Sequence, residues 1–447
     1  MNIQEITYQD SLYAFNKLAH IPGTVFLDGR SDTYSFIGID PFEIITDDLS
    51  NPFELLRLAL NTYHLETIPD LPPFQGGMLG FWGYDLCAKF EKINLQALDE
   101  FSFPGMIVGF YDLVIAYDHR KKQSWIISSG LPEESVQTRH KRAEKRLNWV
   151  CKCLEKKQKI EKNVFKPQSV FSNFTKTEYC HAVEKVKEYI LNGDIFETNI
   201  AQRFHVTLSH DYSITDLYRR LRMFNKAPFS SFLNFGNHVL ASASPERFLR
   251  LKSGCVETKP IKGTLPRSKT LAEDKFLANK LLNSEKDKAE NIMIVDLMRN
   301  DLSKVSLPNS VVVEKLCALE SFSSVHHLVS TLHSELLPEC SAVDLLEACF
   351  PAGSITGAPK VRSMEIISEI EPHRRGAYCG AIGYIGFNGD MDASVTIRTF
   401  AANKNNLSFH AGGAIVLDSD PLSEYQETLD KVNTMINILT KEKQELL

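Results

Sequence analysis

Two carboxylates and a lysine share one face of the helix that the sequence predicts over residues 421–439. Glu424 and Glu427 are three residues apart, and Lys431 follows four residues later; residues at these spacings are neighbours on a helix surface. Two interpretations remain open: a solvated face with acids near the positive helix N-terminus, or carboxylate ligands for a hard cation such as Mg²⁺. Glu290, in a helix predicted further upstream, is another candidate carboxylate.

The glycine-rich segment Phe350–Lys360 (FPAGSITGAPK) has the composition of an anion-binding loop. Its two glycines are separated by three residues instead of four, and Ala-Pro precedes its lysine, so it does not match a phosphate-binding P-loop. The segment therefore predicts a tight turn whose backbone N–H groups, with the hydroxyls of Ser354 and Thr356, could hold an anionic group.

Three further side chains could do chemistry, although each has an ordinary alternative. Lys262, in KPIKGTLP, is either a solvated turn residue or a nucleophile in a pocket, and Glu246, in SASPERF, is either a surface carboxylate or a general acid. The His326-His327 pair has no metal-like partner spacing, so a buried core histidine is expected. His327 is retained as a candidate substrate contact.

Helices alternating with paired strands must position these residues. The sequence predicts helices over 177–192, after Ser284, and from Asp420 to Leu439 with an apolar stripe (Leu422 to Leu439) opposite the acids. It also predicts two strands around the Ser253-Gly254 turn and a three-stranded antiparallel meander over 376–417. Strands in neighbouring pairs favour an α+β layered architecture.

Composition indicates a globular protein in a reducing compartment, and we expect it in the cytosol. Fifty basic and 56 acidic residues give a net charge of −6, which offers no footprint for nucleic acid or a membrane surface. Nine scattered cysteines form no disulfide or zinc pattern. No signal peptide is expected, and the apolar stretch 106–117 is too short to span a bilayer.

A composition shift predicts a division of the chain. The composition shift spans about 139–176, and its first part, 139–166, is rich in Lys, Arg and Glu at helical spacing, as in a solvated helix that leads into a linker. We therefore expect a boundary near 165–172, with an N-terminal companion domain over 1–165 and a catalytic domain over 172–442.

An ordered set of motifs resembles the chorismate-utilising enzymes. The motifs are GDIFETNIAQRF, SASPERF, ETKPIKGTLPR, DKAENIMIVDLMRNDL, VHHLVST, FPAGSITGAPKVRSMEII, GYIGF, SVTIRTF and GGAIVLDSDPLSEYQETLDKV, over about 177–440. In the N-terminal third, TYSFIGIDP and PPFQGGMLGFWGYDL resemble the companion domain of the amine-forming members. The resemblance implies a two-layer β-sandwich of largely antiparallel sheets, built from both segments, with helices packed outside.

The resemblance also implies roles for individual residues. Glu290 and Glu427 match carboxylates that hold Mg²⁺ against the substrate carboxylate, with Glu424 helping, and Glu246 matches the general acid near the departing C4 hydroxyl. Arg398 and Tyr384 match residues that bind the pyruvyl carboxylate. The part around the ring carboxylate is matched by Gly412, Gly413, Lys431 and the SITGA turn with Thr356, Gly357 and Ala358.

Two positions decide among the family's activities. Where isochorismate- and salicylate-forming members have a lysine base, this chain has Glu197, and the amine-forming members usually carry glutamine there. Lys262 lies in PIKGT, which is similar to the aminodeoxychorismate-forming members, whereas anthranilate-forming members have a small residue at that position. The resemblance therefore implies attack of the Lys262 amine at C2 and addition of ammonia at C4, and a nucleophilic lysine is expected to have a pKa below its ordinary value.

The resemblance implies chorismate and ammonia as reactants, in the supply of p-aminobenzoate for folate. No cysteine lies in a Gly-x-Cys-x-Gly setting, so a separate glutamine amidotransferase subunit is expected. Two alternatives stay open, anthranilate formation and a non-catalytic subunit that kept the fold. Leu27-Asp28-Gly29 stands where relatives have a Leu-Glu-Ser tryptophan-binding segment.

Overall fold

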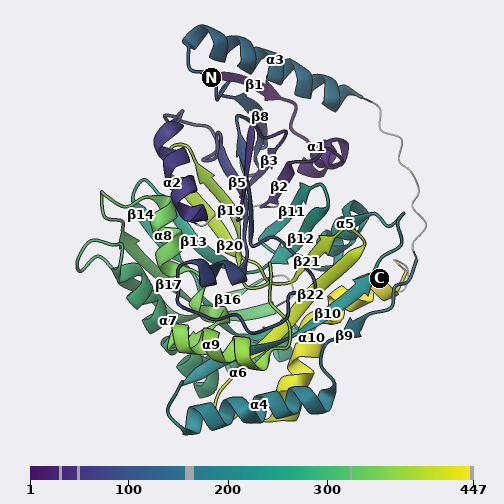
Figure 1. Cartoon of the computed structure of the whole chain (residues 1–447), viewed down its shortest axis with the longest axis vertical. Coiled ribbons are helices and arrows are strands. Elements are labelled where there is room, and N and C mark those ends of the chain that lie inside the picture. Colours follow the sequence, from purple (N-terminus) through teal and green to yellow (C-terminus); the bar gives the residue numbers. More distant parts are fainter. Residues whose placement is uncertain (30–32, 48–50, 157–165, 323–324, 443–447) are drawn as a thin grey trace.

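Two antiparallel sheets lie face to face, with helices on their outer sides (Figure 1). The computed structural model describes residues 1–29, 33–47, 51–156, 166–322 and 325–442. Side chains from both sheets form one core between them, and helices cover each outer face with a core of their own. The predicted α+β sandwich is confirmed.

The larger sheet has twelve strands among the described residues, eleven of them on one continuous path. Its spatial order is β1 (Asn2–Ile6), β8 (Gln123–Ser128), β7 (Leu113–Asp118), β3 (Tyr34–Gly38), β2 (Thr24–Asp28), β11 (Phe229–Phe235), β12 (His238–Ser244), β21 (Thr399–Asn403), β22 (Asn406–Ile415), β10 (Glu197–Thr207) and β18 (Gly357–Ala358), with β9 (Phe171–Ser172) beside β10.

The smaller sheet has ten described strands. Its order is β15 (Ile261–Pro266), β17 (Val325–Glu335), β14 (Cys255–Thr258), β13 (Arg247–Lys252), β20 (Met391–Val395), β19 (Ala381–Gly386), β5 (Gly77–Trp82), β6 (Met106–Tyr111) and β4 (Glu43–Thr46), with β16 (Val312–Ser321) beside β17.

Both sheets join strands from the two sides of the predicted domain boundary. In the larger sheet β2 pairs with β11, and in the smaller sheet β5 pairs with β19 over six residue pairs. The division at 165–172 therefore stays a prediction, and residue 165 lies outside the described residues.

The helices follow the capping signals in the sequence. α4 (Lys176–Leu191) ends before Gly193, whose φ of +80° suits glycine. α7 (Glu285–Ser303) and α10 (Pro421–Thr440) begin after Ser284 and Asp420, whose side chains accept hydrogen bonds from backbone N–H groups of the first turn. The remaining helices are α1 (Ser11–Leu18), α2 (Pro52–Thr62), α3 (Val136–Glu155), α5 (Ile214–Phe224), α6 (Leu271–Leu282), α8 (Ala342–Cys349) and α9 (Lys360–Ile370).

The predicted three-stranded meander is wrong at its middle strand. The run SVTIRTFAA is divided into β20, in the smaller sheet, and β21, in the larger sheet. The chain crosses between the sheets at residues 396–398, where Arg398 has a φ of +51°. Hydrophobic alternation persists through the crossing, so the pattern alone predicts one strand.

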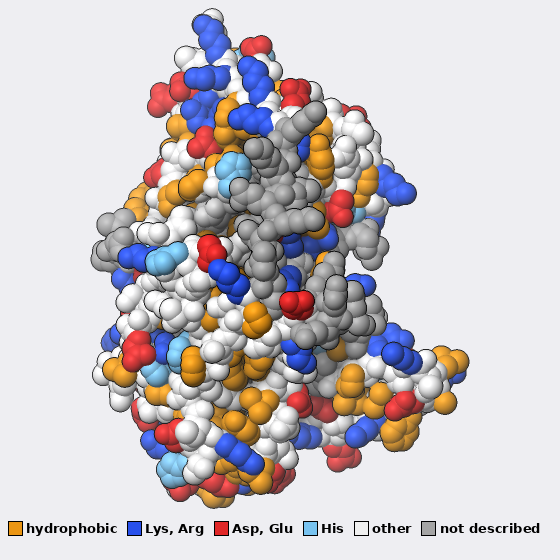
Figure 2. Space-filling model, turned by 90° about the vertical axis from the view of Figure 1, so that its right-hand side faces the viewer, with side chains coloured by type: hydrophobic (Ala, Val, Ile, Leu, Met, Phe, Trp, Pro, Cys, Tyr) orange, Lys and Arg blue, Asp and Glu red, His pale blue; other side chains and the backbone are white. Residues whose placement is uncertain are grey.

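Charges on the surface are mixed. Figure 2 shows Lys and Arg side chains at the top of the molecule, over α3, with acidic side chains among them. None of the described helices is both long and apolar enough to cross a membrane.

Candidate active site

Lys262 and Glu197 form a buried ion pair that links a strand of the smaller sheet to a strand of the larger sheet. Lys262 lies on β15 and Glu197 begins β10; the distance from Nζ to Oε1 is 2.6 Å, with 8% and 0% of the two side chains exposed. Burial lowers the pKa of Lys262, but Glu197, Glu290 and Glu246 raise it, and the net direction is upward. The expectation of a lowered lysine pKa is therefore wrong for the ligand-free protein.

Glu246 lies beside this pair in the link between β12 and β13. It accepts a hydrogen bond from the backbone N–H of Ile261 at 3.3 Å. Burial raises its pKa to about 7, against the opposing effects of Ser354, Ile261 and Lys262. A carboxyl group with this pKa is protonated in part of the molecules near neutral pH and can act as a general acid.

Glu290 and Glu424 face each other from α7 and α10. Both are buried, and the ammonium group of Lys286 lies between them, 3.9 Å from Glu290 Oε1 and 3.5 Å from Glu424 Oε1. Ser419 donates a hydrogen bond to Glu424 at 2.7 Å. Burial raises the pKa of Glu290 to about 7, while Lys262 and Lys286 lower it.

Glu427 and Lys431 lie one turn further along α10. Glu427 Oε1 is 2.6 Å from Lys431 Nζ, and Lys431 donates a hydrogen bond to the Gly412 carbonyl at 2.9 Å. A Cβ on Gly413 would lie 3.1 Å from Glu424 Oε2 and 3.4 Å from Glu427 Oε1. The structure therefore brings together the predicted glycines, carboxylates and lysine.

The predicted division of α10 into an acidic face and an opposite apolar stripe is only partly right. Leu422 is 54% exposed, whereas Glu424 is buried on the side that packs inward. A buried carboxylate that interrupts the apolar face favours a ligand-binding role over a solvated surface role.

The donor chemistry of this cluster fits a hard cation. Glu424 and Glu427 lie beside Gly413, Glu290 approaches from α7, and Lys286 and Lys431 compensate their charge. In this arrangement, no group of three or more His, Cys, Asp or Glu side chains within the described ranges is placed to hold a metal ion. Magnesium at this cluster stays a prediction.

The SITGA turn packs against the start of β10. β18 pairs with Glu197 and Thr198, and a Cβ on Gly357 (φ +151°) would lie 2.2 Å from the Glu197 carbonyl oxygen. Thr356 is fully buried, and its hydroxyl donates to the Ala352 carbonyl at 3.1 Å. Thr356 thus holds the turn itself, and any contact of its hydroxyl with a substrate stays a prediction.

Arg398 is a partly buried arginine without an ion pair among the described residues. Burial lowers its pKa, and no carboxylate contributes to the shift. His327 is close to it: burial and then Arg398 lower the pKa of His327 to about 4, so the imidazole is neutral. His327 also shares a 2.8 Å hydrogen bond with Thr264 on β15. A partly buried cation without a carboxylate partner favours an anionic ligand.

Tyr384 lies in the core between the sheets, and no interaction among the described residues joins it to Arg398, so its role in binding substrate stays a prediction. Alternate residues of a strand face opposite sides of a sheet. Tyr384 faces the core between the sheets, where its ring contacts Phe36 and Phe74. It lines a cavity of about 430 Å³ together with Ile261, the neighbour of Lys262. Leu27-Asp28-Gly29 lines the same cavity.

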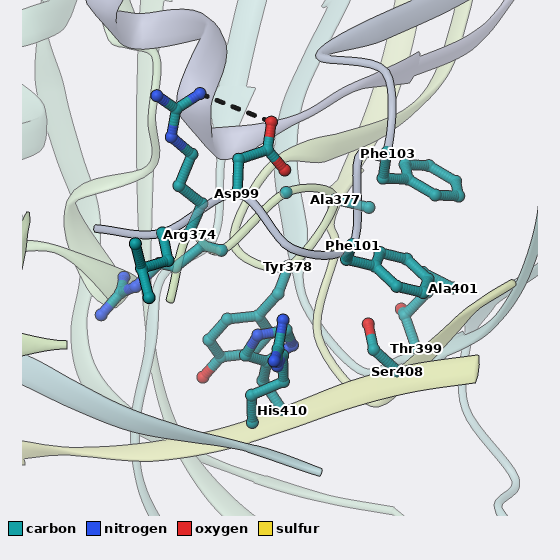
Figure 3. A pocket seen from close by; sticks show the side chains of 14 residues that line it. Asp99, Phe101, Phe103, Arg374, Ala377, Tyr378, Thr399, Ala401, Ser408 and His410 are labelled. Carbon is teal, nitrogen blue, oxygen red and sulfur yellow. Dashed lines mark ion pairs between the residues drawn. The ribbon is translucent and has the colours of Figure 1, made fainter. Parts of the chain in front are cut away.

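A separate small recess of about 20 Å³ lies beside Thr399, the residue after Arg398. Figure 3 shows His410 and Tyr378 in this recess, with Asp99 and Arg374 paired across it at 3.6 Å. The His410 ring stacks on Tyr378 with 4.8 Å between centroids. The recess contains none of the predicted site residues.

Sequence reasoning missed two members of the site. Lys286 gave no signal apart from its position four residues before Glu290, which suits a helix pair. Glu197 was noted as a departure from the resembled pattern, but nothing in the sequence links it to Lys262, 65 residues away.

Comparisons with known proteins agree with this geometry. The sequence matches the family described as chorismate binding enzyme over residues 23–437. Aminodeoxychorismate synthase component 1 of Salmonella typhimurium is 44% identical over 397 residues, 88% of this chain and 84% of the relative. The protein of the same name from Escherichia coli is 40% identical over 457 aligned positions, 96% of each chain.

A solved structure extends the comparison to the fold. The anthranilate synthase component I from Streptococcus pneumoniae matches with a TM-score of 0.82 at 33% identity, covering 98% of this chain and 100% of that one. The similarity thus includes both sheets and both segments of the chain.

Proposed function

Because the chain belongs to the chorismate-binding enzymes, we propose that it converts chorismate and ammonia to 4-amino-4-deoxychorismate, as component 1 of a two-component synthase. The observation that carries the proposal is Lys262, a buried amine held between Glu197 and Glu246. The relatives from Salmonella and Escherichia that bear the name of this activity match 84% and 96% of their lengths.

The reaction begins with binding of the dianionic substrate. Arg398, a partly buried arginine without an ion pair among the described residues, is suited to the pyruvyl carboxylate. The ring carboxylate of the substrate binds beside Gly412, Gly413 and the SITGA turn. Glu290 and Glu427, with Glu424, would hold Mg²⁺, which supplies positive charge to the substrate carboxylate.

The amino transfer proceeds in two substitutions. The neutral Lys262 amine attacks C2, the double bond shifts, and the C4–O bond breaks as Glu246 gives its proton to the departing hydroxyl, which leaves as water. Ammonia then adds at C4, the double bond shifts back and the C2–N bond breaks, which frees Lys262. The new C4 ammonium returns a proton to Glu246. Covalent catalysis divides one difficult substitution into two easier ones.

Ammonia is supplied by a separate glutamine amidotransferase subunit. None of the nine cysteines lies in the Gly-x-Cys-x-Gly setting of such enzymes. The name component 1, borne by the relatives, implies a second component. The product then serves p-aminobenzoate and folate synthesis.

The test is a product assay with the purified chain, chorismate and Mg²⁺. Ammonium at alkaline pH should yield 4-amino-4-deoxychorismate, and glutamine should do so only after a glutaminase subunit is added, because only neutral ammonia is nucleophilic. Anthranilate as the main product would favour the anthranilate-forming alternative. No product under any condition would favour a non-catalytic subunit.

A further inference from the structure

Glu197 has no role in the steps above, yet it is the closest charged group to the nucleophile. Its side chain is completely buried, and Oε1 is 2.6 Å from Lys262 Nζ. The second oxygen, Oε2, is buried without a hydrogen-bond partner among the described residues. A buried carboxylate oxygen without a hydrogen-bond partner destabilises the folded protein, so the presence of Glu197 at this position needs an explanation.

We propose that Glu197 accepts the proton of the Lys262 ammonium before attack and returns it when the lysine is released. The inference rests on the proposed function, since it concerns the same nucleophile. Glu197 is thereby the internal base of the site, and the enzyme needs no exchange of this proton with bulk water.

The surroundings of Lys262 make an internal base necessary. Glu246 faces it from the β12–β13 link, Glu290 from α7 and Glu427 from α10; these carboxylates stabilise the ammonium form, which cannot attack carbon. Glu197 alone among the described carboxylates is in ion-pair contact with it. The nearby His327, on β17, is neutral.

Proton transfer within the pair also suits a buried site. Burial removes much of the hydration of an ion pair. The free-energy difference between the charged pair and the neutral pair of amine and carboxylic acid is therefore smaller than in water. The dianionic substrate adds negative charge, but its two carboxylates are matched by Arg398 and by the cation proposed for Glu290 and Glu427.

The cycle balances for protons and charge. Lys262 as ammonium and Glu197 as carboxylate become an amine and a carboxylic acid. The amine forms the C2–N bond and carries a positive charge until that bond breaks, when the electron pair returns to nitrogen. Glu197 then gives its proton back to the amine, while the Glu246 proton follows the separate route through water and the C4 ammonium.

The experiment compares the wild-type chain with Glu197→Gln, which keeps the shape but cannot accept the proton. Chorismate and Mg²⁺ are mixed with each protein without ammonia, and the Lys262 adduct is followed by rapid quenching and mass spectrometry between pH 6 and 8. The ratio of the two rates is the readout, since Glu246 and the metal site titrate in both proteins and cancel. We expect the ratio of wild-type to variant rate to fall about tenfold per pH unit, because the variant must release its proton to water.

Two further variants complete the design. Glu197→Asp keeps an acceptor, so its ratio to the wild type should be constant with pH, and Glu188→Gln, an exposed change on α4, should match the wild type throughout. A ratio that is constant for Glu197→Gln would overturn the role of Glu197. The absence of an adduct in the wild type itself would instead contradict the covalent route of the proposed function.

Discussion

Replacement of Arg398 by methionine should stabilise the ligand-free protein while weakening chorismate binding. Arg398 is partly buried and no described carboxylate pairs with it. An unpaired buried polar group costs about 1–3 kcal/mol in protein mutational data, and methionine fills similar space without a charge. Arg398→Met should therefore raise the free energy of unfolding by about 1–2 kcal/mol.

The same change should remove the carboxylate contact. Two hydrogen bonds from a charged donor contribute about 3 kcal/mol or more together, which corresponds to a roughly hundredfold or greater rise in Kd. Binding by titration calorimetry and unfolding in urea, each with and without chorismate, measure the two effects. Arg362→Met, which removes a surface arginine paired with Asp194 and Glu365, is the control and should leave chorismate affinity unchanged. A less stable Arg398→Met protein that binds chorismate as tightly as the wild type would refute the reasoning.

Three further predictions concern the carboxylates and the lysine. Glu290→Gln and Glu427→Gln should each lose turnover at limiting Mg²⁺ with the fold retained, as measured by steady-state kinetics and circular dichroism; full activity in both would remove the metal assignment. Lys262→Ala should slow product formation about a hundredfold or more, if covalent catalysis supplies roughly 3 kcal/mol, and should form no adduct by mass spectrometry; a near wild-type rate would contradict the nucleophile. The pKa of Glu246 is about 7 in the folded protein and 4.5 in the unfolded chain. The protonated carboxyl therefore stabilises the folded protein fully below pH 4.5, and this stabilisation is lost as the pH rises to 7. Glu246→Gln should therefore gain stability relative to the wild type across this range, by about 3 kcal/mol, in urea unfolding at several pH values; a difference independent of pH would contradict the raised pKa.

Local signals in the sequence predicted most elements but not where the chain changes sheets. The capping residues Ser284 and Asp420 and the Ser253-Gly254 turn were placed correctly because their cause is local. The crossing at Arg398 was not predicted, since hydrophobic alternation continues on both sides of it. The side of a sheet on which a residue lies depends on register, so the sequence did not predict the contacts of Tyr384 with Phe36 and Phe74.

The candidate site shows the same limit. The motifs predicted that Glu290, Glu427 and Lys262 come together, and the structure brings their helices and strands to one place. The ion pair of Lys262 with Glu197 depends on strands of different sheets, so no spacing in the sequence reveals it. The direction of the lysine pKa followed from that pair and was therefore predicted wrongly.

The pairing of early strands with late ones also sets the order of events during synthesis. β5 is synthesised about 300 residues before its pairing partner β19, and β2 about 200 residues before its partner β11. At roughly 5–20 residues per second, the growing chain carries an open β5 edge for about 15–60 s. An exposed strand edge is a template for pairing with other chains. The first third of this protein therefore depends on protection of its edges at the ribosome until the catalytic residues themselves have been made.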